Sequence, residues 1–252
     1  MMIKLMDLLT EGVHDKGIFK AVFMAGGPGS GKTYVAKQLF GIPDTINVSV
    51  TGMKMINQDK ELKFLLKKYG FDPAFLDKYP DELFRQLTDP NYDDYSGFRD
   101  FTKELAQARK EGYMAGKLGM IIDGTGHKFS KIKAEKKLLE EQGYDTHMVF
   151  VNTSLEVAQQ RNKERDRVLP EKILKKSWTD TRKNLGGYKA LFGSNFVLVD
   201  NSKFLSSKEA QSKFGGLVKG HINKWVTTPI KNPIGRKWVE DQKKLQKAGI
   251  KK

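Results

Sequence analysis

The chain has 252 residues, contains no cysteine and carries a formal net charge of +15. This length is typical of one domain with or without an extension, and the lack of cysteine excludes disulfides, thiolate nucleophiles and cysteine-ligated metal or iron–sulfur sites. The basic composition indicates either a polyanionic partner, such as nucleic acid or nucleotide phosphates, or only a lysine-rich surface. No apolar run reaches the length of a membrane span, and the composition is that of a soluble globular protein.

Predicted strands and helices alternate along the chain. The apolar residues 19–25 predict a buried strand, which is followed by glycines and by a helix over 33–40. Further strands are predicted at 53–56, 119–123, 147–151 and 195–200, with helices at 59–69, 97–118, 129–142, 170–184 and 209–225. Ser154 is the expected N-cap of one more helix. Strands and helices that alternate at this spacing predict an α/β domain with a parallel sheet.

Three segments depart from this alternation. Residues 1–18 precede the first strand, and residues 70–96, with several prolines, tyrosines and aspartates, predict a helical insertion. Residues 227–252 are rich in lysine and predict a basic C-terminal tail, partly helical, outside the core. The predicted division is therefore an N-terminal segment over 1–18, a central domain over 19–226 and a tail over 227–252.

A phosphate-binding motif follows the first strand. Residues 26–33 read GGPGSGKT and match GxxxxGK[ST] in full, between a predicted strand and a predicted helix as the motif requires. Glycines allow successive backbone N–H groups to point at phosphate oxygens, and the N-terminus of the helix adds its positive end. Lys32 is expected to reach the β- and γ-phosphates of ATP, and the Thr33 hydroxyl to bind Mg²⁺. The predicted nucleotide-binding residues are Gly26, Gly27, Pro28, Gly29, Ser30, Gly31, Lys32 and Thr33.

The strand at 119–123 indicates which P-loop chemistry to expect. It ends in Asp123, which is followed by Gly124 rather than by a glutamate that would polarise a water molecule. This weakens the prediction of a motor ATPase and favours phosphoryl transfer to an acceptor hydroxyl. The fold class that follows is a three-layer P-loop NTPase fold with a mostly parallel five-stranded sheet.

Taken together, the loop GGPGSGKT, the run IIDGTG at 121–126 and the run RNKERDR at 161–167 resemble the zeta-toxin and polynucleotide-kinase-like P-loop kinases. The similarity extends over residues 19–201 and is greatest to phage-encoded zeta-toxin-domain nucleotide kinases. It implies an acid after the second strand as the base for the acceptor hydroxyl, a place that Asp59 occupies. The alternative for Asp59 is an acid that only favours the N-terminus of its helix.

The resemblance assigns two further groups of residues. Asp123 and Thr125 would face the acceptor or the water shell of Mg²⁺, although Asp123 also fits a turn residue. Arg161, Arg165 and Arg167 would belong to a lid over about 161–170 that closes on the γ-phosphate. Because Arg161 and Arg165 are four positions apart, they are expected on one helix face, where the alternative is a solvated charged surface.

One departure from the family bears on the acceptor. Zeta toxins that phosphorylate nucleotide sugars carry a D-x-[FY]-R run with a His-Pro after the second strand, whereas Asp59 is followed here by KELKF. This disfavours a nucleotide-sugar acceptor. The basic composition favours a hydroxyl of DNA, RNA or a nucleotide instead.

Both ends of the chain permit further hypotheses. Leu9-Thr10-Glu11 resembles the cleavage site of tailed-phage prohead proteases, so residues 1–18 are either a leader or an amphipathic helix. The lysine-rich tail is either a non-specific nucleic-acid-binding segment, in which Trp225 and Trp238 stack on bases, or a solvated end.

The sequence therefore predicts an ATP- and Mg²⁺-dependent kinase. It is expected in the cytoplasm, that of the host if phage-encoded, or packaged in a virion, and not in a membrane. A phage protein that binds ATP and nucleic acid without turnover is the second hypothesis, and a nucleotide-sugar kinase is the third.

Overall fold

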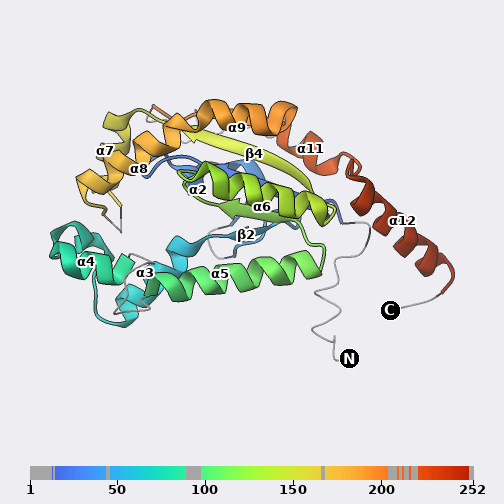
Figure 1. Ribbon diagram of the computed structural model, residues 1–252, viewed down its shortest axis with the longest axis horizontal. Helices are drawn as coiled ribbons and strands as arrows, with labels where there is room; N and C mark the ends of the chain where they lie inside the picture. Colours follow the sequence, from blue (N-terminus) through green and yellow to red (C-terminus); the bar gives the residue numbers. More distant parts are fainter. Residues whose placement is uncertain are drawn as a thin grey trace.

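A computed structural model of the chain describes residues 13, 15–43, 46–88, 98–165, 168–203, 209, 212, 216 and 221–249. Five parallel strands form one sheet with the order β2-β3-β1-β4-β5 (Figure 1). The strands are β1 (Lys20–Ala25), β2 (Lys54–Ile56), β3 (Met120–Asp123), β4 (Asp145–Asn152) and β5 (Phe196–Asp200). The predicted α/β fold with a five-stranded parallel sheet is confirmed.

Helices cover both faces of the sheet because the side chains of each strand alternate between them. On one face, Val22 and Met24 of β1 pack with α2 (Lys32–Phe40) and α11 (Asn223–Thr227). On the other, Ala21 and Phe23 pack with α5 (Phe98–Ala115), α6 (Phe129–Glu141), α9 (Leu185–Phe192) and α12 (Pro233–Lys247). The short η2 (Gly193–Asn195) leads into β5. The resulting three layers place β1, with the P-loop at its end, in the centre of the molecule.

The chain segment that connects β2 to β3 contains a smaller cluster of helices. Leu62 and Leu66 of α3 (Gln58–Lys68) pack against Phe84 and Leu87 of α4 (Asp81–Thr88), with η1 (Pro73–Lys78) between them. The predicted insertion over 70–96 thus contains η1 and α4, while 89–97 lies outside the described residues. Two further helices, α7 (Leu155–Lys163) and α8 (Glu171–Lys183), connect β4 to α9. Ser154 caps α7 as predicted, since its hydroxyl accepts from the backbone N–H of Val157.

The C-terminal segment differs from the prediction of a tail outside the core. Residues 233–247 form α12, and the Trp238 ring packs edge-on against the Phe19 ring with their centroids 5.4 Å apart. A Cβ atom on Gly235 would lie 2.3 Å from the carbonyl oxygen of Gly143, so only glycine permits this approach. The prediction was wrong on this point. It rested on the many lysines, whereas Trp238 and Val239 of the same helix pack against the core. The predicted helix at 209–225 lies mostly outside the described residues.

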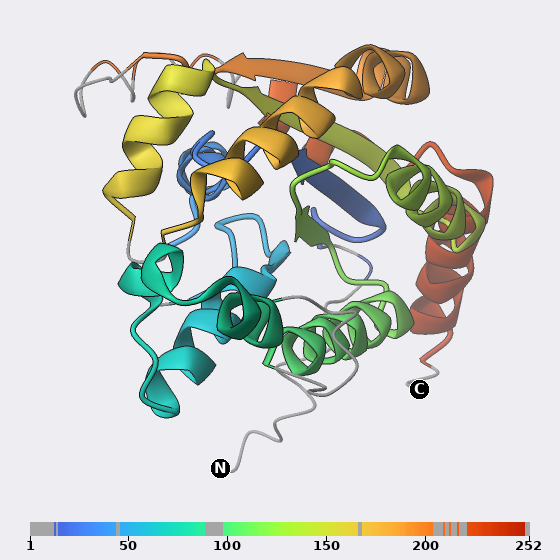
Figure 2. The same ribbon diagram turned by 60° about the vertical axis from the view of Figure 1, so that its left-hand side comes forward.

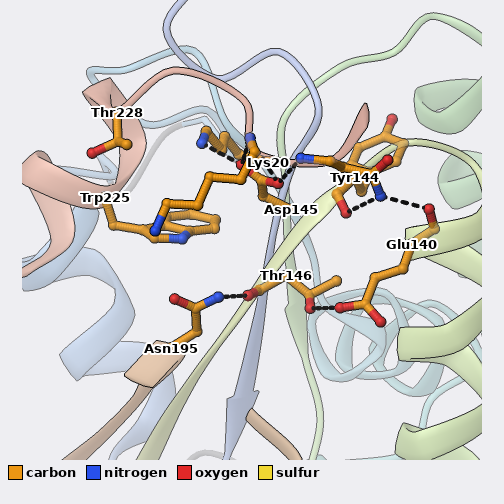
Figure 3. Close-up of a pocket in the computed structure, with 10 residues that line it drawn as sticks. Lys20, Glu140, Tyr144, Asp145, Thr146, Asn195, Trp225 and Thr228 are labelled. Carbon is orange, nitrogen blue, oxygen red and sulfur yellow. Dashed lines mark hydrogen bonds and ion pairs between the residues drawn. The ribbon is translucent and has the colours of Figure 1, made fainter. Parts of the chain in front are cut away.

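A buried carboxylate fastens this segment to the sheet (Figure 3). Asp145, at the start of β4, accepts from the Lys20 ammonium at 2.8 Å and from the backbone N–H groups of Lys231 and Asn232, each at 2.9 Å. Lys20 is only 1% exposed and also lies over the Trp225 ring, 5.1 Å from its centroid. Burial lowers the pKa of Lys20, and the hydrogen bond that Lys20 donates to Asp145 opposes this effect. A cavity of about 310 Å³ remains beside these groups.

We expect Asp145→Ala to lower the free energy of unfolding by about 3–5 kcal/mol, because it leaves the Lys20 ammonium buried without its counter-charge. Urea denaturation of the full chain measures this loss. In the double variant Lys20→Met, Asp145→Ala the uncompensated charge is gone, so part of the stability returns. Equal stabilities for the single and double variants would contradict the importance of the charge pair.

His147 of β4 predicts a dependence of stability on pH. Its side chain is buried, both ring nitrogens lack a hydrogen-bond partner among the described residues, and it packs on Trp225 with ring centroids 4.9 Å apart. Burial, followed by the charge of His221, lowers the pKa of His147 to about 4. The unfolded chain therefore takes up the proton more readily, so stability is complete above the unfolded pKa and falls as the pH drops toward the folded one.

This group alone is expected to make the protein about 2 kcal/mol less stable at pH 5 than at neutral pH. In His147→Phe, which keeps an aromatic ring beside Trp225, that part of the pH dependence should vanish. The comparison uses unfolding free energies of both proteins at the two pH values. Parallel pH profiles would show that His147 does not contribute.

No helix in the part of the chain that the structure describes combines the length and apolarity needed to cross a bilayer.

Candidate functional site

The P-loop connects the end of β1 to α2, and its glycines are required by the backbone. Gly29 and Gly31 adopt left-handed conformations with φ of 75° and 79°. A Cβ atom on Gly29 would also lie 2.3 Å from the carbonyl oxygen of Ala158 in α7. The Lys32 ammonium lies 3.5 Å from the carbonyl oxygen of Gly27. The loop therefore has the curled form that directs backbone N–H groups toward a phosphate.

Side chains that the sequence analysis missed hold this loop from behind. Asn201, which follows β5 and is 4% exposed, donates from Nδ2 to the carbonyl oxygen of Ser30 at 2.8 Å. Trp178 of α8 packs on Gly27 and donates from its indole nitrogen to the carbonyl oxygen of Thr153. A polar residue directly after a predicted strand, as in FVLVDN, was the available signal for Asn201, whereas no local pattern marks Trp178.

The P-loop opens into a cleft of about 1410 Å³. Figure 2 shows the elements around it, with α7 and α8 on one side and α3, α4 and α5 on the other. Residues from several elements line this cleft together, among them Pro28, Gly29, Gly31, Lys32, Thr33, Asn57, Asp59, Asp123, Thr125, Arg161 and Arg165. The structure thus brings the predicted P-loop, acidic and arginine residues to one place.

Asp123 lies at the centre of the cleft. Its Oδ2 accepts hydrogen bonds from the Thr33 hydroxyl at 3.1 Å and from the Asn57 amide at 2.8 Å, while its buried Oδ1 has no hydrogen-bond partner among the residues that the structure describes. Burial raises the pKa of Asp123 to about 6, and the negative charge of Asp59 adds to this effect. The positive charge of Lys32 and the hydrogen bond from Thr33 oppose it. A carboxylate perturbed in this way within a cleft is typical of a functional site.

The residues around Asp123 fit a magnesium ion whose ligands come partly from the protein and partly from the phosphates of a nucleotide. No group of three or more histidine, aspartate or glutamate side chains able to hold a metal occurs among the described residues. Mg²⁺ in nucleotide sites needs no such group, since one or two protein oxygens, water and the phosphates complete its shell. The Thr33 hydroxyl and the unpartnered Oδ1 of Asp123 supply protein oxygens of the required kind.

Asp59 lies in the first turn of α3 and lines the cleft. Its backbone N–H donates to Oδ1 of Asn57, the N-cap of that helix, at 2.8 Å. Its charge raises the pKa of Asp123, so the two carboxylates interact electrostatically. Asp59 is thus both a helix N-terminal acid and a residue of the cleft, and the structure is compatible with each of the predicted roles.

The predicted arginines are arranged differently from one continuous helix face. Helix α7 ends at Lys163 and Glu164 caps it, so Arg165 lies beyond the helix that carries Arg161. The Arg161 guanidinium donates to the carbonyl oxygens of Asn201 at 2.8 Å and Lys203 at 3.1 Å, which fix it beside the P-loop. Arg167 lies outside the described residues. The helix-face prediction was wrong because the spacing alone does not reveal where a helix ends.

A rigid loop between β3 and α6 forms another wall of the cleft. The Asn184 side chain donates to the carbonyl oxygens of Gly126 and His127, and the Tyr188 hydroxyl donates to Gly126 at 2.7 Å. The Thr125 hydroxyl and Nδ1 of His127 share a hydrogen bond. Burial lowers the pKa of His127, and the positive charge of Lys128 lowers this pKa further. Thr125 is therefore held toward the cleft, together with a histidine that the sequence analysis had left out.

The parallel sheet, the P-loop at the end of its central strand and the cleft beside it that contains Asp123 define a P-loop enzyme of the kinase-like type. This agrees with a match of residues 22–185 to the family model described as an AAA domain. The chain belongs to this family, because the match covers more than half of its length. Curated proteins yield no match to the chain.

Several solved structures are similar in fold. A gluconokinase from Sinorhizobium meliloti 1021 is 16% identical with a TM-score of 0.43, over 82% of this chain and 98% of that chain. The PezAT toxin–antitoxin structure from Streptococcus pneumoniae is 17% identical with a TM-score of 0.46, over 94% and 92% of the two chains. A putative kinase from Chloroflexus aurantiacus is 9% identical with a TM-score of 0.46, over 79% and 95%.

Proposed function

We propose that the chain is an ATP-dependent kinase that transfers the γ-phosphate to a hydroxyl of a nucleic acid or a nucleotide. The observation that carries the proposal is the convergence of Lys32, Thr33, Asp59 and Asp123 on one cleft, with Thr33 and Asp123 in direct contact. Phosphoryl transfer needs a phosphate cradle, a metal site and a proton acceptor within reach of one another. These residues supply all three.

In the proposed mechanism, backbone N–H groups of residues 26–33 bind the phosphates and Lys32 neutralises the β- and γ-oxygens. Thr33 and Asp123 would hold Mg²⁺, which supplies positive charge to the triphosphate oxygens when bound. Asp59 accepts the proton of the acceptor hydroxyl. At the same time the hydroxyl oxygen of the acceptor bonds to the γ-phosphorus, and the bond between the γ-phosphorus and the β–γ bridging oxygen breaks. Arg165, and Arg161 beside the P-loop, stabilise the negative charge of the phosphoryl group in transfer. Arg167 stays a proposed member of this set.

The acceptor class is supported by basic side chains on the wall of the cleft beyond Asp123. Lys103, Lys110, Lys128 and Lys131 line it together with Glu104, Glu111 and Glu135, and Lys110 is paired with Glu135 at 2.7 Å. With Lys32, Arg161 and Arg165, basic residues outnumber acidic ones in the cleft lining. Such a surface favours an acceptor that carries phosphates of its own. A nucleotide sugar also carries phosphates and would suit the same surface. Membership of the zeta-toxin subgroup and a phage origin both stay predictions.

The direct test uses ATP labelled in the γ-phosphate and a panel of acceptors. The panel contains single-stranded DNA, duplex DNA with modified bases, RNA, nucleoside monophosphates and UDP-sugars. We expect labelled product with a nucleic acid or a nucleotide. Label transfer to UDP-sugars alone would support the zeta-toxin-like alternative.

The exposed basic residues of α12 favour a second candidate function, which is nucleic-acid binding without turnover. Arg236, Lys237, Lys243, Lys244 and Lys247 lie on the exposed parts of this helix, against the acids Glu240 and Asp241. If this is the function, DNA binding weakens steeply with salt, survives Lys32→Ala and is lost when these basic residues are replaced. ATP binding with no labelled product from any acceptor would also favour it.

A further inference from the structure

We propose that Asn57 is a positioning residue that orients the Asp123 carboxylate and fixes it relative to the start of α3, the helix that carries Asp59. The inference rests on the proposed function and goes beyond it, since Asn57 belongs neither to the P-loop nor to the charged residues predicted from the sequence. A single side-chain amide contacts Asp123 with one end and Asp59 with the other. The position of the Asp123 carboxylate relative to the backbone of Asp59 therefore depends on this one group.

The register of the sheet places Asn57 beside Asp123. Strand β2 ends at Ile56, which pairs with Ile122 of β3, so the next residue of each strand lies at the same carboxyl edge. There the Asn57 Nδ2 donates to Oδ2 of Asp123 at 2.8 Å. Because β2 and β3 are adjacent parallel strands, this contact is built into the sheet.

The hydrogen bonds to Asp123 are unequally divided between its two oxygens. Oδ2 accepts from both Asn57 and Thr33, whereas Oδ1 is buried and accepts from no described residue. Two donors on one oxygen prevent the carboxylate from turning about its last bond. Oδ1 is left as the oxygen available to a magnesium-bound water or to a substrate, and Asn57 is one of the two groups that select it.

The other end of the Asn57 amide acts on Asp59. Its Oδ1 accepts the backbone N–H of Asp59 at 2.8 Å and so caps α3. A helix cap by itself requires only an oxygen at this position, and serine, threonine and aspartate provide it as well. The contact with Asp123 requires a donor in addition, which asparagine alone among these four presents at this reach. Position 57 thus combines a role that serine can fill with a role that it cannot.

This difference allows the two roles to be separated by substitution. Asn57→Ser retains a cap for α3 but is too short to donate to Asp123. Asn57→Asp retains the cap and places an acceptor oxygen against Oδ2 of Asp123. Asp72→Ser changes the cap of η1, which lies outside the described cleft lining, and is the matched control.

We expect the unfolding midpoints of Asn57→Ser and of the control to stay close to that of the wild type. For Asn57→Ser, kcat should fall about 10–100-fold, the range found when groups that orient metal ligands are removed, with little change in the KM for ATP. Asn57→Asp should lose more than Asn57→Ser. The Mg²⁺ concentration at half-maximal rate should rise in both variants, whereas the control keeps wild-type values.

A calorimetric measurement tests the same inference without turnover. The increase in ATP affinity on adding Mg²⁺ should be smaller in Asn57→Ser than in the wild type, while ATP binding without Mg²⁺ stays the same. Wild-type kcat and wild-type Mg²⁺ dependence in Asn57→Ser would overturn the positioning role and leave the kinase intact. An inactive wild type would overturn the proposed function, and the calorimetric comparison would still decide the role of Asn57.

Discussion

Lys32→Ala is expected to reduce γ-phosphate transfer by at least about 10²–10³-fold, the loss that follows removal of one preorganised group from a charged transition state. Lys32 is the P-loop lysine at the first position of α2 and lines the cleft that contains Asp123 and Thr33. Its side chain is half-buried, and its backbone N–H remains in alanine. The fold should therefore persist while phosphate charge goes unneutralised. Transfer of labelled γ-phosphate to the preferred acceptor is the measurement.

Lys133→Ala is the matched control, because Lys133 is an exposed lysine of α6 that does not line the described cleft. It removes the same charge from the same kind of structure. The control should keep wild-type transfer, and both variants should keep the wild-type circular dichroism spectrum. Undiminished transfer by Lys32→Ala would refute the proposed mechanism.

Asp59→Asn is the second variant with a large expected effect, a fall in kcat of about 10²–10³-fold within the usual range for a general base. Asparagine has nearly the same shape and leaves the backbone N–H that Asn57 caps. It cannot take the proton of the acceptor hydroxyl. Binding of ATP should be nearly unchanged, because the P-loop lies at the end of a different strand. Single-turnover transfer and ATP affinity are measured together.

The alternative role of Asp59, an acid at a helix N-terminus, leads to a different result. Loss of that charge alone would lower the free energy of unfolding by about 0.3–1 kcal/mol and leave kcat unchanged. Asp77→Asn on η1 controls for removal of an exposed negative charge near the same group of helices. A wild-type kcat in Asp59→Asn would remove Asp59 from the mechanism.

Much of the sheet and the P-loop is predictable because their signals are local. A short apolar run followed by glycines, lysine and threonine identifies β1 and the loop, and GMIID identifies β3 and Asp123. Strand β4 begins two residues before the predicted 147, at Asp145, whose polar side chain conceals that it is buried against Lys20. The sequence offers no local sign of such a pair, because its members are distant in the chain.

The parts of the site that were missed share one physical cause. Asn57 and Asn201 act through contacts with residues distant in sequence, Asp123 of β3 and Ser30 of the P-loop, and their importance follows from strand order rather than from their neighbours in sequence. The same holds for Trp238, whose partner Phe19 lies near the other end of the chain. Arg161 lies beside the P-loop, and its hydrogen bond to the carbonyl oxygen of Asn201 depends on where β5 ends; its role in a lid stays a prediction.

The hydrogen bonds of Asp145 to Lys20, Lys231 and Asn232 have a consequence for folding during synthesis of the chain. Synthesis proceeds from the N-terminus, so Lys20 and the central strand leave the ribosome long before Lys231 and Asn232 exist. Until those two residues emerge, Asp145 lacks the hydrogen bonds from their backbone N–H groups. In the nascent domain the buried ammonium of Lys20 therefore pairs with a carboxylate that lacks part of its native hydrogen bonds. Completion of the native fold must wait until residues 231 and 232 have left the ribosome.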